Sequence, residues 1–181
     1  MTADDRQGET VGGLDDLPEF LVHAIALEED AAQRYDELAD AMMVHNNTEV
    51  AELFRRMAGF SRLHARDVKD KASGHNLPDL APWDLRWPNA EEPPETAAQD
   101  ESHYRMTAWH AVRQALVSER QGYDYYRLVA DRASEPRVAT LAAEMAEEEA
   151  GHVRTLEEWL ERLPEPPADW AEDDDPAGAP D

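Results

Sequence analysis

The chain has 181 residues, a formal net charge of −24 and no cysteine. This length suits one domain with a sizeable core. The lack of cysteine excludes disulfides, thiolate zinc sites and cysteine-ligated iron–sulfur centres. The negative charge argues against nucleic acid or an anionic membrane as a partner. No stretch is long and apolar enough to span a membrane, and the N-terminus is not a signal peptide, so we expect a cytoplasmic protein.

The first half of the chain predicts a helical hairpin. Residues 1–16 are polar and acidic and are expected to form a flexible lead. Helical periodicity then runs over 17–45 and, after a turn at Asn46 to Thr48, continues to about Ser73. Gly74 is a typical helix stop. The short turn makes the two helices antiparallel neighbours.

The second half repeats this plan after a long connection. Residues 75–105 carry five prolines and are predicted to form a long connection that crosses the bundle from one end to the other. Helices are expected over 106–133 and, with Ser134 as cap, from there to Pro164. Residues 164–181 form an acidic, proline-rich tail.

These elements predict an all-α domain over residues 17–163. Strand signals are weak, because apolar residues follow helical periods and β-branched runs are absent. Two short turns and one long connection predict a ferritin-like four-helix bundle with a single long crossover between its second and third helices.

Each predicted helix carries an apolar seam with polar residues at its middle. Steps of four and three residues mark such an inward-facing seam. The polar members near mid-helix are Glu28 in the first helix, Ser61 and His64 in the second, Glu119 in the third, and Glu149 and His152 in the fourth. Antiparallel packing brings these middles to one height. Burying several carboxylates without partners would cost many kcal/mol, so we expect a paired or metal-bound arrangement.

The chemistry of these residues favours a metal site. Residues three apart share a helix face, so Glu149 and His152 can reach one ion from one helix. His64 offers a second imidazole, and Glu28 and Glu119 would close the site. Oxygen and nitrogen ligands suit iron or manganese and also tolerate zinc. The alternative interpretation is that Glu149 and His152 are a surface pair on an acidic helix.

The same residues resemble a known family. The motifs Glu28-x-x-Ala31-x-x-x-Tyr35, Glu119-x-x-Gly122-x-x-x-Tyr126 and Glu149-x-x-His152 are similar to those of rubrerythrin-type members of the ferritin-like superfamily. The resemblance covers about residues 17–163. It implies a non-haem di-iron site with ligands at Glu28, His64, Glu119, Glu149 and His152. It also implies that Tyr35 and Tyr126 hydrogen-bond ligand carboxylates.

The chain departs from that family pattern in three places. Ser61 stands where the second helix normally offers a bridging Glu, and Gly122 replaces a second Glu of the third helix. A rubredoxin-like electron-entry domain is missing. Three carboxylates and two imidazoles balance only part of the charge of two divalent ions. A weak di-metal site, a mono-metal site and a water-completed site therefore all stay open.

Three functions are compatible with this sequence. The first is an oxidoreductase of the peroxidase or ferroxidase type, reducing peroxide or dioxygen with electrons from an unidentified external donor. The second is a non-catalytic iron-binding or buffering protein. The third is a helical scaffold, expected as a homodimer, with a vestigial site. The sequence does not identify the metal, the donor or the oligomer.

The other histidines are predicted to lie at the surface or rim; they are His23, His45, His75, His103 and His110.

Overall fold

The computed structural model describes residues 16–85 and 106–167. These ranges form four long helices and no strand. The helices are α1 (Leu17–Val44), α2 (Thr48–Ala72), α4 (Ala108–Arg132) and α5 (Pro136–Arg162), and a short 3₁₀ helix, η1, covers Pro82–Asp84. The predicted all-α fold is confirmed, and both ends of each of the four long helices lie within two residues of their predicted positions, whereas η1 was not predicted. Most of the predicted lead, of the predicted connection and of the predicted acidic tail lies outside the described residues.

The helix ends show why the chain folds into separate helices. The Asp16 carboxylate accepts a hydrogen bond from the Glu19 backbone N–H at 3.3 Å and so caps α1. Asn46, with φ of 58°, turns the chain between α1 and α2, and Gly74, with φ of 89°, follows the end of α2. The prediction of Ser134 as a cap was wrong. Glu135 takes that position without a side-chain cap bond, and Pro136 supplies the preset first turn of α5.

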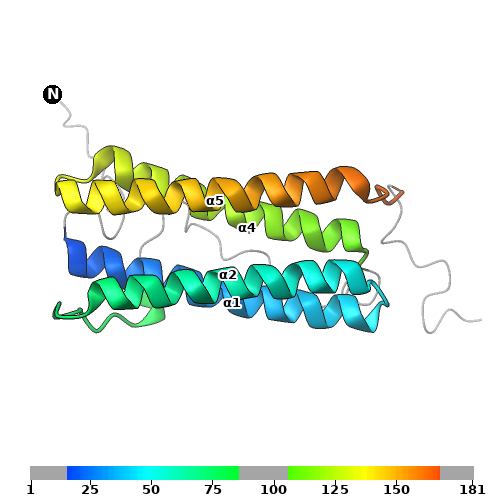
Figure 1. Ribbon diagram of the computed structural model, residues 1–181, viewed down its shortest axis with the longest axis horizontal. Helices are drawn as coiled ribbons and strands as arrows, with labels where there is room; N and C mark the ends of the chain where they lie inside the picture. Colours follow the sequence, from blue (N-terminus) through cyan, green and yellow to red (C-terminus); the bar gives the residue numbers. More distant parts are fainter. Residues whose placement is uncertain (1–15, 86–105, 168–181) are drawn as a thin grey trace, which may run out of the picture.

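The helices form two antiparallel hairpins packed side by side (Figure 1). α1 packs along α2, and α4 packs along α5. α2 ends where α1 begins, whereas α4 begins at the opposite end of the bundle. The chain must therefore travel the length of the bundle between α2 and α4, which is the single crossover of the ferritin-like fold.

The core consists of two apolar clusters, one toward each end of the bundle. One is centred on residues such as Met42, Phe54 and Val112, and the other on residues such as Phe20, Tyr125 and Val138. Between them lie the middles of the helices, where Glu28, Glu119 and Glu149 are buried. None of the helices in the part of the chain that the structure describes has the length and apolar character needed to traverse a bilayer.

Candidate metal centre

Side chains from all four helices meet at mid-bundle. Glu28 comes from α1, His64 from α2, Glu119 from α4, and Glu149 and His152 from α5. The carboxylate-bearing residues Glu28, Glu119 and Glu149 are only 1%, 5% and 3% exposed. All five residues selected from the seams therefore converge in the core, and none of the three carboxylates points to solvent.

The α4/α5 half of the centre is a compact three-residue cluster. His152 Nδ1 lies 3.1 Å from Glu119 Oε2 and 3.3 Å from Glu149 Oε2. One potential ligand atom from each of the three residues lies within 4.8 Å of the others. Because Glu149 and His152 are three residues apart on α5, one helix presents an oxygen and a nitrogen to the same point.

A tyrosine orients this half from the first hairpin. The Tyr35 hydroxyl donates a hydrogen bond to Glu119 Oε1. The other oxygen of Glu119 faces His152. Both oxygens of this buried carboxylate therefore have partners, and the tyrosine hydroxyl is satisfied as well.

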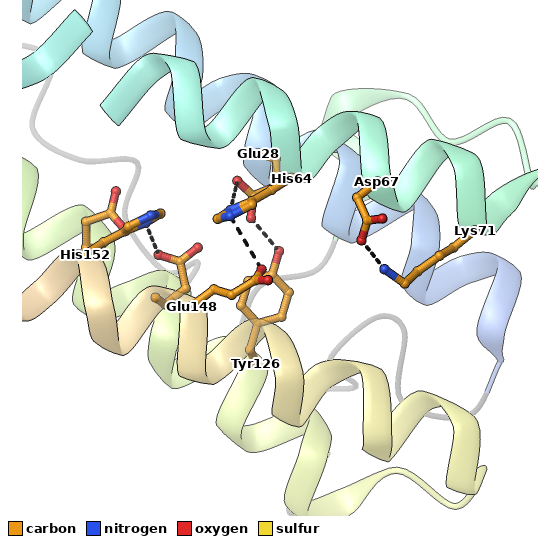
Figure 2. Close-up of polar contacts among 9 residues, drawn as sticks. Glu28, His64, Asp67, Lys71, Tyr126, Glu148 and His152 are labelled. Carbon is orange, nitrogen blue, oxygen red and sulfur yellow. Dashed lines mark hydrogen bonds and ion pairs between the residues drawn. The ribbon is translucent and has the colours of Figure 1, made fainter. Parts of the chain in front are cut away.

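The α1/α2 half is looser. His64 Nδ1 lies 3.7 Å from Glu28 Oε2, too far for a hydrogen bond (Figure 2). This nitrogen is buried and has no hydrogen-bond partner. On the far side of Glu28, the Tyr126 hydroxyl donates to Oε1 at 3.5 Å. A buried imidazole nitrogen facing a carboxylate without bonding to it is an arrangement that a cation between them would satisfy.

The two halves touch through their imidazoles. The rings of His64 and His152 are stacked, with centroids 5.4 Å apart and an interplanar angle of 14°. The two groups of donor atoms are therefore adjacent parts of one centre.

The protonation of the α4/α5 cluster shows how its charge is compensated. Although burial favours the neutral acid, hydrogen bonds from Glu149 and His152 lower the pKa of Glu119 to about 2. Burial, with the neighbouring Glu119, raises the pKa of Glu149 well above its usual value. Despite burial, the bonds to Glu119 and Glu149 raise the pKa of His152 to about 10. Protons on Glu149 and His152 thus offset a concentration of negative charge that a metal cation would offset in their place.

The pKa values of His64, Tyr35 and Tyr126 are also raised. The Glu28 carboxylate facing His64 raises the pKa of that imidazole, against the effect of burial. Burial raises the pKa of Tyr35 and of Tyr126 well above the usual range, so both remain neutral hydrogen-bond donors.

Comparison with known proteins identifies the family of the chain. The family model for rubrerythrin matches residues 19–106 and 111–173. The chain belongs to the rubrerythrin family. It is also similar to the crystal structure of an uncharacterized conserved protein from Magnetospirillum magnetotacticum MS-1, with 45% identity and a TM-score of 0.73. That similarity covers 84% of this chain and 98% of the other. No curated protein matches the sequence.

Two positions at which this rubrerythrin departs from the family pattern lie at the centre. Ser61, one turn before His64, is 1% exposed, so the α2 side of the centre has a buried hydroxyl in place of a carboxylate. Gly122 lies directly against Glu149, and a Cβ added there would be 3.7 Å from Glu149 Cδ. That is ordinary contact, so the glycine leaves room beside the carboxylate without being required by close packing.

Three further acidic or histidine side chains lie on the helices that form the centre. Glu148, a half-exposed residue of α5, lies 3.7 Å from His64 Nε2 and was missed (Figure 2). The one sequence feature that could have identified Glu148 is its position directly before Glu149 in an acidic run. Asp67, one turn beyond His64 on α2, pairs with Lys71 at the surface. His23 was predicted to lie at the rim but is fully buried, with Nδ1 2.9 Å from the Glu19 carbonyl oxygen and its ring stacked on Tyr125.

Proposed function

We propose that this rubrerythrin binds iron at the mid-bundle centre and acts as a non-haem di-iron oxidoreductase on peroxide or dioxygen. The observation that supports it most is the convergence of three buried carboxylates and two imidazole Nδ1 atoms from four helices. Nitrogen and carboxylate donors of this kind suit iron, and manganese or zinc would also be accepted.

The donor set fits a pair of ions unequally. Glu119, Glu149 and His152 offer three ligand groups for one ion. Glu28 and His64 offer two donors for a second, and the buried nitrogen of His64 lacks any other partner. Bound iron would supply the electrons for reducing the oxidant.

The protein's own groups prepare the site for that chemistry. Once a metal ion has displaced the proton of Glu149, the three carboxylates would supply three negative charges, and Tyr35 hydrogen-bonds one of these carboxylates, Glu119. The apolar clusters on either side of the centre limit the access of bulk water. Reduction of peroxide to two water molecules consumes two protons and two electrons, and we expect the electrons to come from an external donor, since the chain has no cysteine for a rubredoxin-type centre. A cytoplasmic homodimer acting in this way is part of the proposal.

A non-catalytic iron-binding role is the second candidate. The observation that favours it is Ser61, because a hydroxyl is a poor ligand and leaves the α2 side one carboxylate short. An ion held weakly there would be exchanged rather than cycled. A scaffold with a vestigial site is the third.

One experiment separates the three. Protein is loaded anaerobically with ferrous iron, freed of excess metal, and mixed with hydrogen peroxide in the presence of a chemical reductant, with zinc-loaded protein as control. We expect iron to be retained and peroxide to be consumed over many cycles. A single round of oxidation would instead support the buffering role, and failure to retain iron would leave only the scaffold.

A further inference from the structure

A pocket on the surface between α2 and α5 reaches His152. Its volume is about 300 Å³. Leu53 and Met57, both buried, form its apolar base, and Phe60 forms a wall. The Phe60 ring is 48% exposed and is stacked on the His152 ring, with centroids 6.1 Å apart. The pocket therefore presents exposed apolar surface directly beside a residue of the centre.

A glycine keeps this pocket open. Gly151 lines it, and a Cβ added there would meet only the Arg154 side chain, at 3.8 Å. Close packing against a neighbouring helix therefore does not explain a glycine that costs up to about 1 kcal/mol in mid-helix. Any side chain here would instead occupy space that the pocket now offers to a ligand.

The lining of the pocket includes an arginine and no acidic residue, although the protein as a whole is very acidic. Arg56 lines the pocket one turn before Phe60, so the guanidinium and the ring lie on the same side of α2. Arg56 is exposed, and the ion pairs that the structure shows among the described residues do not include it. With a net charge of −24 on the whole chain, an arginine without an acidic partner beside an apolar hollow is suited to an anionic group.

We propose that this pocket binds a small amphipathic organic anion, a carboxylate on a short alkyl chain. Arg56 pairs with the carboxylate, and the chain covers Phe60 and Met57 above Gly151. The volume is about ten times the ~30 Å³ that a water molecule occupies in the liquid, which is far more than peroxide or dioxygen requires. The site goes beyond the proposed oxidoreductase function and does not depend on a bound metal.

The test is a titration of the full-length protein with octanoate, in which calorimetry measures the binding. Arg56→Gln should weaken binding at least tenfold, whereas Arg55→Gln, the matched change at the adjacent exposed arginine outside the pocket, should leave it unchanged. Gly151→Leu should abolish binding by filling the pocket. The matched Gly59→Leu change, at a glycine whose surroundings are open, should not. Octyltrimethylammonium, with the same chain and the opposite charge, should bind at least tenfold more weakly than octanoate.

Several results would overturn the proposal. They are equal weakening by the Arg55 and Arg56 changes, unchanged binding in Gly151→Leu, and equal binding of the cationic probe. The titration is repeated after a chelator has removed bound metal, where octanoate must bind as before. Loss of binding on chelation would mean that octanoate binds a metal ion rather than the pocket, whatever the outcome for iron and peroxide.

Discussion

The two halves of the centre are built from the same hairpin plan but differ in completeness. In the α4/α5 half, His152 lies 3.1 and 3.3 Å from two carboxylates, which share protons with it. In the α1/α2 half, His64 lies 3.7 Å from one carboxylate and its Nδ1 has no hydrogen-bond partner. The helix face and the imidazole are the same in both, and the difference is Ser61 where α5 has Glu149.

This contrast shows what one carboxylate does in a buried site. On α5, the extra negative charge draws protons onto the cluster and closes it through hydrogen bonds. On α2, without that charge, the His64 ring stacks on the His152 ring, and its nitrogens lie 3.7 Å from the Glu28 and Glu148 carboxylates. We therefore expect the α4/α5 half to bind the first metal ion and the α1/α2 half to bind a second, more weakly.

The largest effect should come from removing the imidazole of the stronger half. His152→Ala deletes a donor at the three-residue cluster and should lower affinity for the first ion more than 100-fold, since losing even an outer partner of a ligand costs on the order of 10–100-fold. His64→Ala should spare the first ion and remove the second. Metal titration of both variants checks this, with His75→Ala, outside the centre, as control. Equal losses in the two variants would contradict the ranking of the halves.

Restoring the missing carboxylate should make the halves alike. Ser61→Glu places a carboxylate one turn before His64 and should strengthen binding of the second ion by about tenfold or more and speed ferrous oxidation. If no second ion binds, the same change buries an unpaired carboxylate and destabilises the fold by several kcal/mol. Iron stoichiometry and melting temperature, with and without ferrous iron, distinguish these outcomes. Ser61→Gln, which adds similar bulk without charge, is the matched control.

Acid should weaken metal binding mainly at the α4/α5 half. Because the pKa of His152 is raised to about 10 and that of Glu149 is also raised, a cation must displace protons from both near neutral pH. The affinity for the metal should therefore rise with pH until the pH exceeds these pKa values. Below them, each unit decrease in pH should lower the affinity by up to about tenfold for each proton displaced. Calorimetry in buffers of different ionisation enthalpy should detect more than one proton released per first ion at pH 7. Release of none would show that the cluster is not protonated as described.

The smallest expected effects are those of the two tyrosines. Tyr35→Phe removes a buried hydrogen bond to the charged Glu119 and should lower the free energy of unfolding by about 1.5–3 kcal/mol. Tyr126→Phe removes only a 3.5 Å contact to Glu28 and should cost about 0.5–1 kcal/mol. Denaturant unfolding of both variants tests this order. A larger loss of unfolding free energy for Tyr126→Phe than for Tyr35→Phe would contradict the conclusion that the α4/α5 half is the more tightly bonded.

The sequence predicted the helices and the inward direction of Glu28, Glu119 and Glu149 because helical periodicity records which face is buried. It did not predict the burial of His23, since α1 contacts more than one helix and its buried face is wider than a single seam. Nor did it predict that Glu148 faces His64, because adjacent members of an acidic run differ only in direction around the helix. The sequence also did not predict which of these groups carry protons. Their protonation depends on distances between side chains of different helices, and the spacing of residues within one helix does not determine these distances.

The most direct test of the account is the position of iron in the protein. Crystals grown anaerobically with ferrous iron would be measured at the iron absorption edge. We predict a strong anomalous peak among His152 Nδ1, Glu119 and Glu149, and a weaker one between His64 Nδ1 and Glu28. Iron bound only at surface carboxylates, or a stronger peak at the α1/α2 half, would contradict the account.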